Sequence, residues 1–221
     1  MLDWLAANWT EVLGFGTGAI CVLLAARRNI WNFPIGIANN LVFIVLFVGA
    51  ALYADAGLQI VYLVLGAMGW AAWARRGREE EVGFAKRTPR PAVVPLVVAA
   101  VVGTVVLTFV LTTFTDSTTQ LADASTTSVS LVAQFMLNRR WIENWFVWIA
   151  VDVAYVGLYA VKGLWITGAL YLLFIALCVG GYRAWMRHRA MEVDAGPNPT
   201  LSLVEEGAPR PSRDPRASVE T

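Results

Sequence analysis

The sequence is poor in charge and has few of the side chains that carry most enzyme chemistry. Only 15% of its 221 residues are charged and 57% are hydrophobic, which excludes an ordinary soluble domain. The single histidine, His188, cannot form a metal site alone, and the sequence contains no HExxH or paired CxxC motif. Cys21 and Cys178 both lie in apolar segments, so we interpret them as packing residues rather than a disulfide. No metal or other cofactor is expected.

Long apolar stretches take the place of these missing features. A membrane-spanning helix needs about 20 predominantly apolar residues, and the chain divides into seven stretches of this kind. They are predicted near residues 6–26, 31–50, 53–74, 91–114, 118–137, 141–160 and 163–186. The ten tryptophans fit this interpretation because tryptophan favours the interface between membrane and water. We therefore expect an all-α, multi-pass protein of the cell membrane, surrounded by lipid, with seven transmembrane helices.

One three-segment pattern occurs twice, at an offset of 112 residues (139 − 27). The residues that coincide at this offset are Arg27-Arg28 and Arg139-Arg140, Asn32 and Asn144, Asn40 and Asp152, Gly69 and Gly181, and Trp73 and Trp185. Chance similarity between apolar segments is the alternative explanation, but composition does not force the paired arginines or the matching polar positions. Repeats of membrane helices with polar groups at mid-depth are typical of solute carriers.

Basic residues are concentrated in alternate connections between the predicted helices. They follow the first, third, fifth and seventh helices, whereas the connection before the last helix holds only Lys162. Because basic residues mark the cytoplasmic side, we expect the N-terminus outside and the C-terminus in the cytoplasm. Two three-helix units joined directly would be inverted relative to each other. The fourth helix crosses the membrane once between them, so both copies have the same orientation. This predicts a 3+1+3 arrangement of parallel repeats.

The predicted organisation has four parts. Residues 1–78 form the first three-helix repeat, residues 79–116 a linker with helix four, and residues 117–190 the second repeat. Helix four has only threonine as polar content, so we expect it to face lipid or a neighbouring protomer. Residues 191–221 are rich in Pro, Gly, Glu, Arg and Ser, which predicts a disordered cytoplasmic tail.

The sixth predicted helix carries a polar and aromatic stripe. Its members recur at steps of three and four, which places them along one helix face: Trp141, Asn144, Trp145, Trp148, Asp152, Tyr155 and Tyr159. Asp152 falls about halfway along the segment, where a carboxylate is so costly that it normally faces a cavity or a partner. An alternative is that Asp152 only forms a hydrogen bond with a neighbouring helix.

Polar residues of other helices complete the predicted substrate site. Its members are Asn40, Gln59, Thr127, Gln134, Asn144, Trp145, Trp148, Asp152 and Tyr159. Aromatic faces attract planar and cationic rings, and the amides of Asn and Gln can recognise a carboxamide. No Arg or Lys lies in the central part of any span, which favours an uncharged or cationic solute over a nucleotide or nucleic acid. The last helix also lacks the lysine of a retinal protein.

Several segments resemble the motifs of one family of membrane proteins, in both order and spacing. They are Trp31–Asn40 (WNFPIGIANN), Leu52–Gln59 (LYADAGLQ), Ser130–Gln134 (SLVAQ) and Glu143–Trp145 with Trp148, Asp152 and Tyr159. The family is that of the PnuC vitamin transporters. The resemblance implies uptake of nicotinamide riboside, a cationic pyridinium nucleoside, by facilitated diffusion to supply NAD synthesis. It also implies a homotrimer whose protomers resemble the SWEET sugar carriers.

Other functions remain as alternatives at this point. Relatives in the family carry thiamine or riboflavin, and we place thiamine first because the predicted pocket includes a carboxylate. A ligand-binding membrane sensor would need one ordered site but would not need two parallel repeats. An intramembrane enzyme would need a nucleophile with a base or metal ligands at depth, and the spans supply one Asp without His or Lys beside it. We therefore expect a transporter and not an enzyme.

Overall fold

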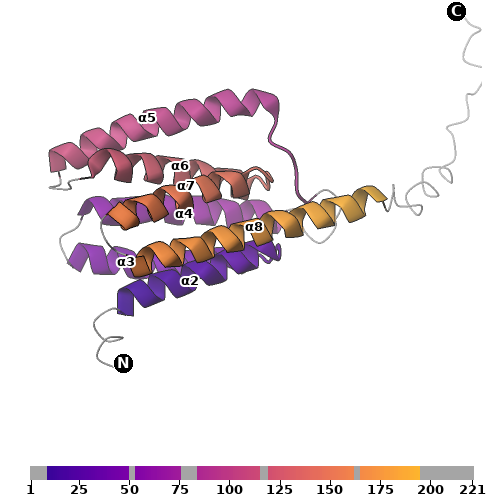
Figure 1. The fold of residues 1–221 in the computed structure, drawn as a ribbon, viewed down its shortest axis with the longest axis horizontal. Helices are drawn as coiled ribbons and strands as arrows, with labels where there is room; N and C mark the ends of the chain where they lie inside the picture. The colour runs from indigo at the N-terminus through magenta and orange to yellow at the C-terminus, as the bar shows by residue number, and fades with distance from the viewer. Residues whose placement is uncertain (1–8, 50–52, 76–83, 115–118, 162–164, 195–221) are drawn as a thin grey trace, which may run out of the picture.

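The computed structural model describes residues 9–49, 53–75, 84–114, 119–161 and 165–194 (Figure 1). The helices of this part of the chain are α2 (Trp9–Ala26), α3 (Asn32–Gly49), α4 (Tyr53–Arg75), α5 (Arg90–Phe114), α6 (Gln120–Asn138), α7 (Asn144–Val161) and α8 (Trp165–Asp194). The predicted all-α fold with seven helices is confirmed. The last helix is longer than expected, since α8 continues to Asp194 through the first residues of the predicted tail. The rest of that tail lies outside the described residues.

Most of the helices are suited to a membrane by length and composition. Four described stretches are long and apolar enough to cross it: Asn32–Gly49, Ala56–Arg75, Arg90–Phe114 and Gly168–Met191. α2 and α7 contain shorter apolar stretches, Gly16–Ala26 and Asn144–Ala160. α6 is more polar, and it lies against α4, α5 and α7. Because neighbouring helices surround α6, its polar side chains face protein rather than lipid.

The helices alternate in direction along the bundle. α2, α4, α6 and α8 run one way, and α3, α5 and α7 run the other way (Figure 1). The α2–α4 group therefore has the same orientation as the α6–α8 group, as the predicted parallel repeats require. The two groups meet where α2 packs on α8 and α4 packs on α6, while α5 lies outside and packs mainly on α6.

The turns after α2 and α6 have the same conformation. Arg28 and Arg140, which coincide at the 112-residue offset, have left-handed backbones with φ of 57° and 60°. After α2, the N–H of Asn29 donates to the carbonyl of Leu24 at 2.8 Å and the N–H of Arg28 to that of Ala25 at 3.0 Å. This pair of bonds defines the Schellman motif, in which glycine usually occupies the left-handed position. The same pair follows α6, so the arginine pairs mark one structural turn that occurs twice.

Phe84 lies between the two copies at the end of the bundle where the arginine pairs lie. Its ring forms T-shaped pairs with Trp73 and Trp185, with centroid distances of 5.0 Å and 5.2 Å and interplanar angles of 88° and 86°. The guanidinium carbons of Arg28 and Arg140 lie 5.4 Å and 4.6 Å from the same ring centroid. In the repeat, Trp73 is equivalent to Trp185 and Arg28 is equivalent to Arg140. Phe84 therefore occupies the approximate twofold axis of the bundle.

Equivalent glycines make room for equivalent rings in both copies. Trp73 packs on Phe33 with a centroid distance of 5.0 Å, and Trp185 packs on Trp145 at 5.4 Å. A Cβ atom on Gly69 would overlap the Phe33 ring, and a Cβ atom on Gly181 would overlap the Trp145 ring.

The segment that carries Phe84 is attached to the second copy. The N–H of Lys86 donates to the carbonyl of Arg140, and the N–H of Ile142 donates to the carbonyl of Lys86, both at 2.9 Å. The N–H and hydroxyl of Thr88 both donate to one carboxylate oxygen of Glu143 at 2.8 Å. The residue equivalent to Glu143 in the first copy is Trp31, which offers no such acceptor. The connection between α4 and α5 is thus fastened to the turn between α6 and α7.

Candidate functional site

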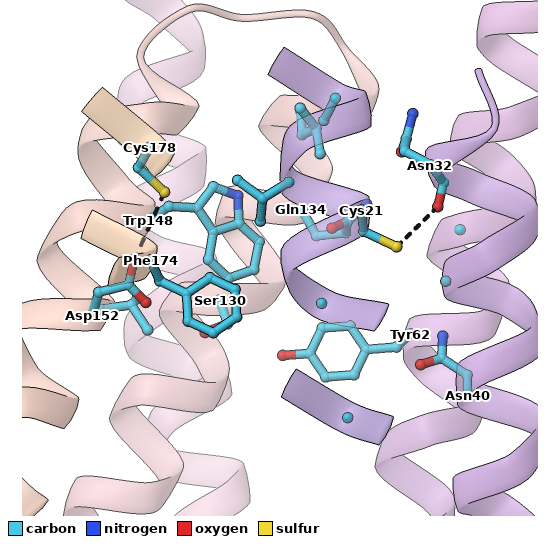
Figure 2. A pocket seen from close by; sticks show the side chains of 18 of the residues that line it. Cys21, Asn32, Asn40, Tyr62, Ser130, Gln134, Trp148, Asp152, Phe174 and Cys178 are labelled. Carbon is cyan, nitrogen blue, oxygen red and sulfur yellow. Dashed lines mark hydrogen bonds between the residues drawn. The ribbon is translucent and has the colours of Figure 1, made fainter. Parts of the chain in front are cut away.

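A cavity of about 780 Å³ lies between the two three-helix groups (Figure 2). Its described walls come from α2, α3, α4, α6, α7 and α8, and α5 contributes none of these lining residues. The lining follows the repeat, because equivalent residues of both copies face the same space. On α3 the lining includes Phe33, Gly36 and Asn40, and on α7 it includes their equivalents Trp145, Trp148 and Asp152.

Asp152 supplies a carboxylate to this apolar space. Its side chain is 7% exposed, and the Sγ atom of Cys178 on α8 lies 3.8 Å from its Oδ2. A thiol is a weak hydrogen-bond donor, and among the described residues no Lys or Arg forms an ion pair with Asp152. Burying a carboxylate without a strong partner is unfavourable. The cavity is therefore suited to a ligand that brings a positive charge or hydroxyl donors to Asp152.

Trp148 lies one helical turn before Asp152 and also faces the cavity. Figure 2 shows its indole between Cys178 and Phe174 on one side and Cys21 on the other. The Tyr62 side chain extends from α4 on the opposite wall, with its hydroxyl directed toward Ser130 and Phe174, and Asn40 lies beside it in the same view. The cavity thus combines an aromatic plane with polar groups on both sides.

Three tyrosines form a stacked aromatic wall between α7 and α8. Tyr155 and Tyr171 have ring centroids 4.7 Å apart, Tyr159 and Tyr171 5.4 Å, and Tyr155 and Tyr159 6.1 Å, with interplanar angles of 28°, 18° and 24°. All three line the cavity. A planar ring that enters the cavity therefore meets parallel aromatic faces as well as the Trp148 indole.

Seven of the nine residues predicted for the substrate site line the cavity. They are Asn40, Gln59, Gln134, Trp145, Trp148, Asp152 and Tyr159. The structure does not place Thr127 or Asn144 at the cavity. Thr127 lies about one turn before Ser130, the first α6 residue of the lining. Asn144 is fully buried, and its Nδ2 donates to the carbonyl of Trp141 at 2.6 Å, which fixes the start of α7.

The α8 wall was missing from the predicted site. Tyr171, Phe174 and Cys178 line the cavity at steps of three and four residues. At the 112-residue offset, Tyr171 corresponds to Gln59 and Phe174 to Tyr62. Applying the repeat to Gln59, which was already predicted for the site, would have found Tyr171, and Phe174 lies about one turn after it.

A buried cluster closes the cavity at the end of the arginine pairs. The cluster contains Phe84, Trp73 and Trp185, and it shares Ala25, Phe33, Leu137, Trp145 and Cys178 with the cavity wall. Because Phe84 packs on both tryptophans, passage through this end requires the cluster to separate. The described residues thus form a cavity between two parallel halves, with a buried cluster at one end.

Comparison with known proteins identifies the family. A model described as nicotinamide mononucleotide transporter matches residues 8–187. The nicotinamide riboside transporter PnuC of Escherichia coli K12 is 24% identical over 204 residues, covering 81% of this chain and 85% of that protein. The riboflavin/roseoflavin transporter RibM of Streptomyces davaonensis is 31% identical over 183 residues, covering 80% of this chain and 84% of that protein.

A solved structure agrees with these matches. The crystal structure of the vitamin B3 transporter PnuC is similar with a TM-score of 0.64 and 25% identity, and the match covers 86% of each chain. The chain therefore belongs to the nicotinamide mononucleotide transporter family of membrane proteins, the PnuC family that its motifs predicted.

Proposed function

We propose that this protein carries nicotinamide riboside across the cell membrane by facilitated diffusion and so supplies NAD synthesis. The observation that carries the proposal is the pairing of Trp148 and Asp152, one helical turn apart on the wall of a chamber between two parallel repeats. The names of the PnuC relatives support this substrate. Because the relatives are transporters, the same comparison favours transport over catalysis.

The ligand chemistry fits the cavity walls. The pyridinium ring can stack on the Trp148 indole, and a desolvated cation–π contact contributes about 2 kcal/mol. Asp152 can accept hydrogen bonds from ribose hydroxyls and also offsets the positive charge of the ring. The amides of Asn40, Gln59 and Gln134 are available to the remaining polar groups of the ligand.

A phosphorylated ligand fits this cavity poorly. The lining among the described residues contains no Lys or Arg. An ionised phosphate would therefore lose its hydration without gaining a cationic partner, which costs several kcal/mol. We accordingly expect nicotinamide mononucleotide to bind at least tenfold more weakly than the riboside.

Transport would proceed by alternating exposure of the chamber. The two three-helix groups can rock against each other around a fixed site, as in other repeat-built carriers. The charge asymmetry supports a cytoplasmic position for the arginine pairs, hence an outside N-terminus and a cytoplasmic C-terminus. In this orientation the Phe84 cluster closes the chamber toward the cytoplasm.

The same proposal includes assembly into a homotrimer. The family resemblance implies it, and the outer surface of α5 offers a long apolar face for a neighbouring protomer or lipid. Val94, Val101, Val105 and Phe109 are all more than half exposed on that face. Mass measurement of the protein in detergent or nanodiscs would test the trimer directly.

Riboflavin is the second candidate substrate. The relative RibM, 31% identical over most of its length, is a riboflavin/roseoflavin transporter. The stacked wall of Tyr155, Tyr159 and Tyr171 also offers several nearly parallel aromatic faces to a fused ring system. Thiamine has no comparable observation in its favour here.

Binding and flux measurements on purified protein test the function. Isothermal titration calorimetry should show tightest binding for nicotinamide riboside in a panel with its mononucleotide, riboflavin and thiamine. Proteoliposomes without any kinase should take up radiolabelled riboside until inside and outside concentrations are equal. Binding without flux would indicate a sensor, and accumulation above the external concentration would contradict facilitated diffusion.

A further inference from the structure

A hydrogen bond between two amides at the cavity wall decides which atom of Gln134 can face a ligand. Gln134 lines the cavity, and its Nε2 donates to Oδ1 of Asn138, one turn later on α6, at 3.1 Å. Asn138 does not line the cavity and is 8% exposed. Its own Nδ2 donates to the backbone carbonyl of Leu65 on α4 at 2.8 Å.

The chemistry of these groups fixes the orientation of both amides. A backbone carbonyl can only accept a hydrogen bond, so the NH₂ group of Asn138 must be the part that faces Leu65. The carbonyl oxygen of Asn138 then faces Gln134 and can also only accept, so Gln134 must present its NH₂ group to Asn138. The Oε1 atom of Gln134 is left for the cavity. Among the described residues, Gln134 forms no second side-chain hydrogen bond.

The first repeat holds this arrangement in place although Gln134 belongs to the second. Gly69 on α4 leaves the space that Asn138 occupies, because a Cβ atom there would overlap the Asn138 carboxamide. At the 112-residue offset, Asn138 corresponds to Ala26 and Gln134 to Val22. The first copy therefore has no equivalent amide pair. The pair places a hydrogen-bond acceptor on the wall formed by the second copy, where the repeat alone would place none.

We propose that Asn138 is a positioning residue that sets substrate specificity by holding Gln134 as a hydrogen-bond acceptor. The ligand must then present a hydrogen-bond donor to Oε1 of Gln134, and the N–H of a primary carboxamide or of a ring imide is such a donor. A ligand with a carboxylate or an N-methyl group at that place leaves Oε1 without a donor, which is unfavourable in a buried site. This inference rests on the proposed function of the cavity as the substrate site, and it narrows the class of vitamin that the cavity accepts.

Two pairs of ligands test the requirement for a donor. Nicotinamide riboside and nicotinic acid riboside differ in carboxamide against carboxylate, and riboflavin and N3-methylriboflavin differ in imide N–H against N-methyl. Calorimetry on the full-length protein should show binding of at least one of these pairs. In that pair, the ligand with the N–H donor should bind about tenfold more tightly, or better, than the ligand without it. In Asn138→Leu the Gln134 amide can rotate, so this preference should fall by about threefold to tenfold.

Matched variants separate positioning from stability. Asn138→Asp keeps an acceptor for Gln134 but loses the amide donor to Leu65, so it should keep the preference while melting at a lower temperature. Ser128→Ala removes another buried polar group of α6 that does not line the cavity, and it should leave the preference unchanged. Gln134→Leu removes the acceptor itself and should lose the preference as Asn138→Leu does.

The outcomes distinguish this inference from the proposed function. An unchanged preference in Asn138→Leu, with tight vitamin binding retained, overturns the role of Asn138 and leaves the transport proposal standing. If Asn138→Leu does not fold, the other two variants decide the role of Asn138. An undiminished preference in Gln134→Leu, or a lost preference in Asn138→Asp, also overturns it. If neither nicotinamide riboside nor riboflavin binds the wild-type protein, both proposals fail.

Discussion

Replacing Phe84 with alanine should weaken the contact between the two copies at the arginine-rich end. The Phe84 side chain is 7% exposed and lies between Trp73 and Trp185, with centroids 5.0 Å and 5.2 Å away. Truncating a buried phenylalanine costs about 3–5 kcal/mol in a well-packed core, and each aromatic pair contributes about 0.5–1.5 kcal/mol beyond its buried area. We take about 3 kcal/mol as the expected loss, because the segment stays attached to the second copy through backbone bonds to Arg140 and Ile142. For a domain of this size, that loss corresponds to a fall in Tm of roughly 6–12 °C.

The same substitution should open the cavity toward that end. Cys21 and Cys178 are the only cysteines of the sequence, and both line the cavity. They are therefore native reporters for a membrane-impermeant thiol reagent. In vesicles of known orientation, the reagent should label Phe84→Ala faster than wild type when it is added on the side of the arginine pairs. Bound substrate should slow this labelling.

An exposed residue outside the proposed protomer face provides the control for Phe84. Val45 on α3 is 72% exposed and does not line the cavity, so Val45→Ala should change neither Tm nor labelling by much. If Phe84→Ala retains the wild-type Tm and the wild-type labelling rate, then the Phe84 cluster neither joins the two copies nor closes the cavity.

Three further predictions concern the cavity and its walls. Trp148→Ala should weaken riboside binding by roughly 30-fold, because a desolvated cation–π contact of about 2 kcal/mol is lost; calorimetry that gives wild-type affinity would show that this indole only packs. Asp152→Asn should weaken binding by about tenfold or more, since a hydrogen bond to a charged group contributes about 1.5–3 kcal/mol, and unchanged affinity would leave Asp152 as a structural residue. Gly181→Ala should destabilise the protein by about 1–3 kcal/mol, because the added methyl overlaps the Trp145 ring. Gly180→Ala is its control, since a Cβ atom at Gly180 meets nothing within 4 Å, and equal melting temperatures for the two glycine variants would contradict this packing.

Hydropathy and the repeat predicted most of the fold. In a membrane, an apolar run of about 20 residues can form all its backbone hydrogen bonds within itself only as a helix. The number of helices therefore followed from the sequence. The end of α8 did not, because hydropathy reports burial in lipid and not helix length. The helix continues past the apolar stretch, through Arg183, Arg187 and Arg189, to Asp194. Such a polar extension is allowed once the helix has left the membrane.

The candidate site was predicted best where side chains follow helical spacing. Trp145, Trp148 and Asp152 on α7 were found in this way, and all three line the cavity. Asn144 has the same spacing but lies at the start of α7, where its amide donates a hydrogen bond to the carbonyl of Trp141. Periodicity gives the direction of a side chain and not its depth along the helix axis, so it could not separate Asn144 from the cavity residues.

Phe84 shows a different limit of sequence reasoning. It lies in a connection between helices, and no periodicity or repeat partner identifies it. Its position depends on the hydrogen bonds of Lys86 and Thr88 to the turn between α6 and α7 and on the meeting of Trp73 with Trp185. Contacts of this kind exist only after the two copies have packed together, so they become visible only in the folded chain.

The cavity combines a symmetric backbone with an asymmetric lining. The parallel copies give two equivalent halves, and Phe33 packs on Trp73 in the first copy as Trp145 packs on Trp185 in the second. Several of the side chains that differ line the cavity. Where the second copy has Trp148 and Asp152, the first has Gly36 and Asn40. The carboxylate of Asp152 therefore stands on one side of the cavity only, with the neutral amide of Asn40 at the equivalent place on the other.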